Sequence, residues 1–223
     1  MVLLEGALDG AGLRHEVFHE ARRTAVRDPQ HVVHDENLSV GVWACAEAAI
    51  TPAPDELESI YRALVLGLRD YVGKNGFPGV LIGLSGGIDS ALTAAVAVDA
   101  LGPDKVHCVL MPSPYTSKVS VEDAELTAAN LGIRLDTIAI DPAMQAFEGM
   151  LKDAFVDRDA DTTEENIQAR SRGLTLMALS NKLGHMVLST GNKSEMSVGY
   201  ATLYGDMCGG YSVLKDVYKT TVF

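Results

Sequence analysis

The stretch LSGGIDS, residues 84–90, joins an apolar run at 79–83 to a second apolar run at 91–98. This order predicts a buried strand, a glycine-rich turn and a helix. The turn directs backbone N–H groups toward one point, and the following helix directs the positive end of its dipole there. Two adjacent glycines let an anion approach the backbone without meeting a Cβ atom, so we expect phosphate to bind here.

The side chains of this turn refine the prediction. Ser85 and Ser90 offer hydroxyl donors, whereas Asp89 would repel bare phosphate, which indicates a metal ion between carboxylate and ligand. The stretch lacks the lysine of a Walker A loop and the spacing of a dinucleotide fingerprint. It resembles the pyrophosphate loop of the N-type ATP pyrophosphatases, a resemblance that implies cleavage of ATP between its α and β phosphates. The alternative is a strand-to-helix turn without a ligand.

Strand-like and helical patterns alternate from residue 79 onward, after a helix predicted at 55–72. This alternation predicts an α/β fold, a doubly wound parallel sheet with flanking helices, whose ligands bind at the carboxyl ends of the strands. Strands are predicted at 79–85, 106–111, 133–140 and 185–190. Helices are predicted at 88–101, 119–131, 142–152 and 163–183, with the beginning of another in 215–223.

Composition excludes several classes of function. A net charge of −12 argues against binding to nucleic acid or to an anionic membrane. Apolar runs are too short to span a membrane, and the first residues do not resemble a signal peptide. Three widely spaced cysteines fit inert thiols in a reducing, cytoplasmic location. The four histidines in 14–36 lie among charged residues, which favours a solvated surface over a metal site.

Further polar strings lie near the predicted strand ends. TGNKSE, residues 190–195, follows an apolar strand, and such loops often carry function, although an ordinary polar loop is the alternative. TEENIQARSR, residues 163–172, places Asn166 and Arg170 on one helix face, toward a ligand or toward solvent. Residues 199–211 are rich in Gly and Tyr, which fits either a loop that orders over substrate or a plain connection.

Together these strings resemble NAD synthetase. GLSGGIDSALTAAVAVDALG, TEENIQARSRG, LSTGNKSEMSVGYATLYGDMCGGY and KDVYKT follow one another in the family's order across residues 55–223. TGNKSE resembles the glutamine-dependent bacterial branch more than the ammonia-dependent branch. The resemblance implies a Rossmann-like fold of the adenine nucleotide α-hydrolase type and a homodimer. Helices 55–72 and 163–183 are candidate dimer contacts, although both could equally cover the sheet.

The resemblance also implies a reaction. ATP activates the carboxylate of nicotinic acid adenine dinucleotide (deamido-NAD) by adenylation, pyrophosphate leaves, and ammonia, free or released from glutamine, displaces AMP to give NAD. Asp89 and Glu195 are the implied catalytic residues and the ligands of Mg²⁺. The implied ATP-binding residues are Gly83, Leu84, Ser85, Gly86, Gly87, Ile88, Asp89, Ser90 and Thr190. The implied deamido-NAD-binding residues are Asn166, Arg170, Glu195, Asp206 and Lys215.

The sequence departs from the family at both ends. Residues 1–50 are too few for the amidase domain of glutamine-dependent members and contain no lysine, so Cys45 is expected to be a structural thiol. We interpret 1–50 as a remnant of such a region or an irregular segment, and 51–223 as an ATP-pyrophosphatase domain incomplete at its C-terminus. Two alternatives remain: another pyrophosphatase-loop ligase, such as a tRNA-thiolating enzyme or GMP synthetase, and a catalytically silent ATP-binding module.

Overall fold

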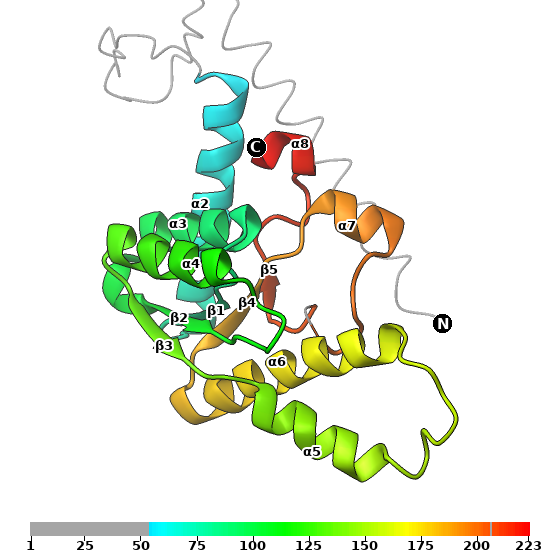
Figure 1. Cartoon of the computed structure of the whole chain (residues 1–223). Coiled ribbons are helices and arrows are strands. Elements are labelled where there is room, and N and C mark those ends of the chain that lie inside the picture. The colour runs from blue at the N-terminus through cyan, green and yellow to red at the C-terminus, as the bar shows by residue number, and fades with distance from the viewer. Residues whose placement is uncertain (1–53, 206) are drawn as a thin grey trace, which may run out of the picture. The chain divides into compact units, whose positions relative to one another are not determined.

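The computed structural model describes residues 54–205 and 207–223, which belong to one compact unit, Pro52–Phe223. Its centre is a five-stranded sheet in the order β3-β2-β1-β4-β5, and every pair of neighbours is parallel (Figure 1). The strands are β1 (Val80–Gly83), β2 (Val106–Leu110), β3 (Arg134–Thr137), β4 (Met186–Ser189) and β5 (Tyr211–Ser212). The predicted doubly wound parallel sheet is confirmed.

Helices cover both faces of the sheet (Figure 1). One layer contains α2 (Glu56–Asn75), α3 (Ile88–Leu101) and α4 (Lys118–Leu131), and the other contains α5 (Asp141–Leu151) and α6 (Thr162–Leu183). Alternate strand residues supply the two cores: Val80 and Ile82 join one cluster, whereas Leu81 joins the other, and all three are fully buried. Burial on both faces explains why these strands read as continuous apolar runs.

The two helices named as candidate dimer contacts take part in this covering. Leu68 and Val72 of α2 are buried in the first core, and Leu176 of α6 is buried in the second. Each helix also carries exposed leucines, Leu66 on α2 and Leu174 on α6. Packing inside one chain therefore accounts for the apolar pattern of both helices, and the homodimer stays a prediction.

The structure also contains elements that the sequence did not predict. The polar loop after β4 begins a short helix, α7 (Lys193–Val198), and β5 extends the sheet within the Gly- and Tyr-rich segment. A 3-10 turn, η1 (Pro103–Lys105), precedes β2. The final helix, by contrast, was predicted: it forms as α8 (Lys219–Val222) and begins four residues later than residue 215. Two-residue strands and one-turn helices are too short to show periodicity, which is why these elements escape sequence patterns.

Strand order fixes where a ligand can enter. The chain runs outward from β1 through β2 to β3 and then returns to the other side of β1 to form β4. In such sheets, the crevice between the two strands at which the order reverses is the usual ligand site. The glycine-rich loop follows β1 and the TGNKSE string follows β4, so both predicted strings flank this crevice.

None of the helices described is long and apolar enough to cross a membrane.

The first core includes Cys108 on β2, a thiol that is fully buried. Burial raises the pKa of this thiol to about 12, so the reactive thiolate is scarce at neutral pH. We expect Cys108 of the folded chain to resist alkylation by iodoacetamide at pH 8. Peptide mass spectrometry would show this, with chain unfolded in urea as the reactive control; rapid modification of the folded chain would contradict it.

Candidate active site

The loop after β1 turns sharply because of its first glycine. Gly86 has a φ of +81°, and a Cβ atom placed on it would lie 2.1 Å from the backbone oxygen of Ser120 at the start of α4. Gly87 is the N-cap of α3 and has no side chain that could accept a hydrogen bond from the first turn of that helix. The positive end of α3 is therefore left for an anion to contact.

Two serines hold the loop in shape. The Ser90 hydroxyl donates to the Gly87 carbonyl oxygen at 2.9 Å and lies 3.1 Å from the Ser85 hydroxyl. The backbone N–H of Gly87 donates to the Ser85 oxygen at 3.2 Å, and that of Ser85 donates to the Ser90 oxygen at 3.2 Å. This network of hydrogen bonds within the loop stabilises the turn.

Two cavities meet at this loop, and Ser85 and Thr190 line both. The larger, of about 570 Å³, lies against the carboxyl ends of β1, β2 and β4 and has a largely apolar wall. The smaller, of about 200 Å³, contains both predicted carboxylates, Asp89 and Glu195. Its other lining residues include Gly87, Ser90, Gly191 and Tyr200. A larger, mostly apolar cavity beside a smaller one that holds two carboxylates matches a ligand with a flat ring and a charged tail.

The two carboxylates that line the smaller cavity contact Asn192 and Lys219, which lie behind its wall. Asp89 lies in the first turn of α3, where it accepts a hydrogen bond from the Asn192 amide at 3.0 Å and pairs with the ammonium group of Lys219. Glu195 accepts from the Asn192 backbone N–H at 3.2 Å, which closes the capping box of α7. Asn192 therefore links the two carboxylates, and the ammonium group of Lys219 pairs with one of them, Asp89.

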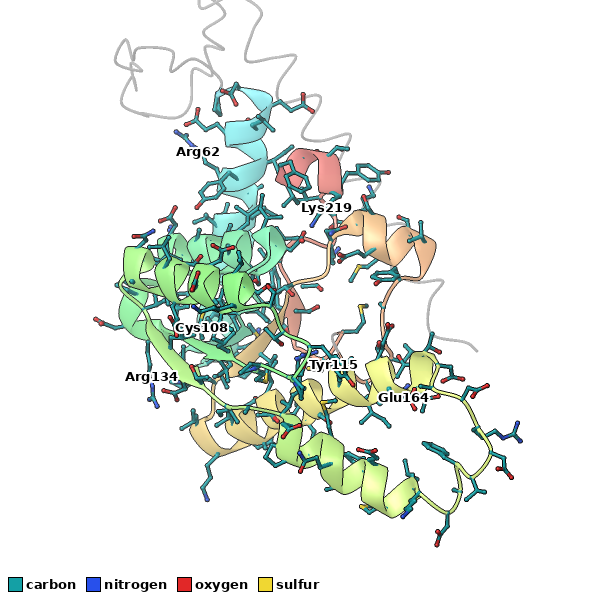
Figure 2. The ribbon with its side chains drawn as sticks, viewed as in Figure 1. Arg62, Cys108, Tyr115, Arg134, Glu164 and Lys219 are labelled. Carbon is teal, nitrogen blue, oxygen red and sulfur yellow. The ribbon has the colours of Figure 1, made fainter. Side chains whose placement is uncertain are left out.

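Backbone contacts hold Lys219 near Asp89. The N–H of Lys219 donates to the Ser194 hydroxyl at 3.0 Å, and the N–H of Lys193 donates to the Val217 carbonyl at 2.9 Å. These bonds fasten the start of α8 to the start of α7, and Figure 2 shows Lys219 on α8 close to α7. The lysine thus reaches the loop from a part of the chain 130 residues away.

The structure brings the predicted ATP-binding residues together and separates some predicted deamido-NAD-binding residues. Asn166 and Arg170 of α6 contact the 199–205 loop instead of lining these two cavities: Asn166 accepts from the Thr202 hydroxyl at 2.9 Å, and Arg170 donates to the Leu203 carbonyl at 3.3 Å. Lys215 pairs with Asp216 at 2.5 Å and lines a separate cavity beside α2. Asp206 lies outside the described residues.

Sequence reasoning assigned no role to Lys219, Asn192 or Arg172. Lys219 belongs to the KDVYKT string, and Asn192 begins an N-x-x-E pattern that resembles a capping box. These two patterns mark Lys219 and Asn192 in the sequence, but neither pattern predicts a contact with Asp89. Such contacts depend on the packing of α7 and α8 against α3, which no local pattern encodes.

Arg172 lines the larger cavity from α6. Its guanidinium Nε donates to the Met111 carbonyl at 3.1 Å, and burial lowers its pKa. Arg172 forms no ion pair within the described part of the chain. A half-buried positive charge without a carboxylate partner favours an anionic or strongly polar group in the cavity.

The donor set fits a hard divalent cation such as Mg²⁺. Asp89 and Glu195 supply carboxylate oxygens to one cavity, and the Asp89 carboxylate already contacts a cationic group, that of Lys219. Across the described residues, no group of three or more His, Cys, Asp or Glu side chains forms a metal site by itself. Mg²⁺ is commonly held by one or two carboxylates together with substrate phosphates, which is the arrangement this cavity permits.

Comparisons with known proteins converge on one family. The family model described as NAD synthase matches residues 60–223. A glutamine-dependent NAD(+) synthetase of Rhodobacter capsulatus is 55% identical over 193 residues, which are 86% of this chain and 35% of that protein. A relative with the same name from Thermotoga maritima is 58% identical over 177 residues, 79% of this chain and 31% of that protein. The chain spans about a third of the length of the curated relatives it matches.

Solved structures give the same result. The glutamine-dependent NAD+ synthetase of Acinetobacter baumannii, in complex with ADP, superposes with a TM-score of 0.77 at 56% identity, covering 78% of this chain and 33% of that one. The NH3-dependent NAD synthetase of Campylobacter jejuni has a TM-score of 0.69 at 30% identity, covering 76% of this chain and 71% of that one. An NMN synthetase of Francisella tularensis has the same score and identity, covering 76% and 68%.

Proposed function

Because the chain belongs to the NAD synthase family, we propose that it carries the ATP-dependent amidation of deamido-NAD to NAD. One observation carries this proposal: residues of the SGGIDS loop and of the TGNKSE string line the same cavity. This cavity lies beside β1 and β4, where the strand order of the sheet reverses. Neither string alone would define the chemistry. Together they put a glycine-rich loop and two carboxylates on one cavity, and Lys219, from a third string, pairs with one of these carboxylates.

ATP is proposed to occupy both cavities. Its adenosine moiety would fill the apolar larger cavity, and its phosphates would lie against residues 84–90 and the N-terminus of α3. The relative from Acinetobacter baumannii, whose structure holds ADP, supports an adenine nucleotide here. Arg172 would offer its remaining N–H groups to the nucleotide, and Thr190, which lines both cavities, would contact it where they join.

The proposed reaction needs positioning and charge rather than a covalent nucleophile. A carboxylate oxygen of deamido-NAD attacks the α-phosphorus, the bond to the bridging oxygen breaks, and pyrophosphate leaves. Ammonia then attacks the adenylated carbonyl carbon, and AMP leaves with the bonding electrons to give the amide and a proton. Asp89 and Glu195 would hold Mg²⁺, which would neutralise charge on the leaving pyrophosphate. Lys219 lies where it would supply positive charge to the same oxygens.

The proposed deamido-NAD-binding residues mostly lie outside the two cavities, so their contribution is proposed to be indirect. Asn166 and Arg170 fasten the 199–205 loop to α6, so they would shape the place where deamido-NAD lies, together with Asp206 and Glu195. Lys215, in its separate cavity, would contact deamido-NAD only if this segment moved. The glutamine-dependent relatives support glutamine as the nitrogen source of the whole protein, with free ammonium as the alternative. The protein is further proposed to be a homodimer located in the cytoplasm.

The test is a direct assay of the 223-residue chain. Incubation with ATP, Mg²⁺, deamido-NAD and ammonium is expected to yield AMP and NAD in equal amounts, measured by chromatography. Nicotinic acid mononucleotide in place of deamido-NAD is the control, because an NMN synthetase is among the similar structures. ATP binding without AMP in the presence of deamido-NAD would contradict the proposal and favour a silent ATP-binding module. AMP with the mononucleotide alone would instead assign a different substrate.

A further inference from the structure

Asn192 connects the two carboxylates of the smaller cavity. Its side-chain amide donates to Asp89 Oδ1 at 3.0 Å, and its side-chain oxygen accepts from the Glu195 N–H at 3.0 Å. Its own backbone N–H donates to Glu195 Oε2 at 3.2 Å. One residue therefore contacts both proposed cation ligands, which lie on different helices, α3 and α7.

The burial of Asn192 indicates that these bonds are strongly constrained. The residue is fully buried, and a buried amide without partners is costly, which favours each of its hydrogen bonds. Asn192 lies 103 residues from Asp89 in the sequence. A helix N-cap alone does not require such a contact: at the other capping box, Asp161 at the start of α6 is exposed and accepts from Thr163 in its own helix.

These bonds leave one oxygen of each carboxylate outside the contacts with Asn192. Asp89 Oδ1 is held by Asn192, whereas Oδ2 contacts Lys219. Glu195 Oε2 is held by the backbone of Asn192, and Oε1 has no hydrogen-bond partner among the described residues. The bonds to Asn192 therefore fix the orientation of both carboxylates, and a cation at Asp89 Oδ2 would take the place of the Lys219 ammonium group.

We infer that Asn192 is a positioning residue that sets Asp89 and Glu195 as a pair, so that each binds the divalent cation of the nucleotide complex through one oxygen. The inference rests on the proposed function. It extends that function, because it assigns the metal affinity of the site to a residue that touches neither metal nor nucleotide. Residues that orient metal ligands typically change metal affinity by roughly 10–100-fold when they are replaced.

The test uses N192S, which keeps an oxygen able to cap α7 but is too short to donate to Asp89. We expect the Mg²⁺ concentration for half-maximal ATP binding to rise roughly 10–100-fold, as followed by calorimetry. ATP affinity in EDTA should stay unchanged, because the glycine-rich loop is not altered. D161S makes the same kind of change at the capping box of α6 and should leave the Mg²⁺ requirement unchanged.

A second variant separates positioning from folding. N192A removes both the cap and the donor, so it should lower the melting temperature more than N192S while shifting the Mg²⁺ requirement by a similar factor. If N192S binds ATP with the Mg²⁺ requirement of the unmodified chain, the inference is wrong. If instead the unmodified chain shows no Mg²⁺-dependent ATP binding, the proposed cation site itself is wrong, which is a different result.

Discussion

Replacing Asp89 with alanine is expected to abolish the Mg²⁺-dependent part of ATP binding and leave the fold intact. Asp89 supplies one of the two carboxylates in the smaller cavity, and its ion pair with Lys219 shows that this position already favours a cation. A metal ion contributes several kcal/mol to its phosphate ligand, so loss of about 2.8 kcal/mol would lower affinity in Mg²⁺ about 100-fold. Calorimetric titration of ATP into the variant, with and without Mg²⁺, measures this directly.

Lys219 leads to a different expectation for the ATP affinity of D89A when Mg²⁺ is absent. In the variant, its ammonium group loses Asp89 and can turn to the phosphates, so ATP affinity in EDTA should not fall. D104A, which changes an exposed aspartate of η1, is the matched control and should bind ATP as the unmodified chain does. Equal ATP affinity of D89A and the unmodified chain in Mg²⁺ would show that the cation lies elsewhere.

Replacing Gly86 with alanine is expected to damage both stability and nucleotide binding. The new Cβ atom would lie 2.1 Å from the Ser120 backbone oxygen, and a φ of +81° is itself unfavourable for alanine. Since the obstacle is backbone, the loop and α4 must separate. We expect a loss of about 3 kcal/mol, equivalent to a fall in melting temperature of roughly 6–12 °C for a domain of this size. ATP binding should be lost with the shape of the loop.

Gly132 supplies the matched control for this prediction. It has a similar φ of +64° at the end of α4, but a Cβ atom there would have no neighbour within 4 Å among the described residues. G132A should therefore show only the backbone strain, about 1 kcal/mol, with ATP affinity unchanged. Comparable melting temperatures for G86A and G132A would mean that the loop and α4 yield easily, and the argument from close packing would fail.

The sequence predicted the central sheet because its strands are buried on both faces. Val80, Leu81 and Ile82 form an unbroken apolar run, and the structure buries all three. The edges were harder to predict. At one edge, β3 is partly exposed and spans only Arg134–Thr137, about half of the predicted 133–140, while β5 at the other edge has two residues. Edge strands lack a full apolar pattern, so their limits depend on neighbouring strands.

The candidate site likewise contains one part that the sequence predicted and another that it could not. Residues adjacent in the sequence, such as those of the glycine-rich loop, could be grouped from the sequence because one turn holds them together. Contacts across the fold could not: the Asp89 pairs with Asn192 and Lys219 join residues 103 and 130 positions apart. The placement of Lys215 beside α2 depends likewise on the path of residues 211–218, which carry no periodic pattern.

The reversal of strand order beside β1 has a consequence for the synthesis of the protein. β1 is complete soon after residue 83 leaves the ribosome, and β2 can pair with one of its edges, but its other edge pairs with β4, Met186–Ser189. At about 5–20 residues per second, that edge waits roughly 5–20 s for its partner. Throughout this interval a strand of Val, Leu and Ile presents unpaired backbone groups to other nascent chains. The same order of strands that creates the crevice thus exposes the growing polypeptide to misassembly, and we expect its yield in a cell to rise when chaperones shield this edge.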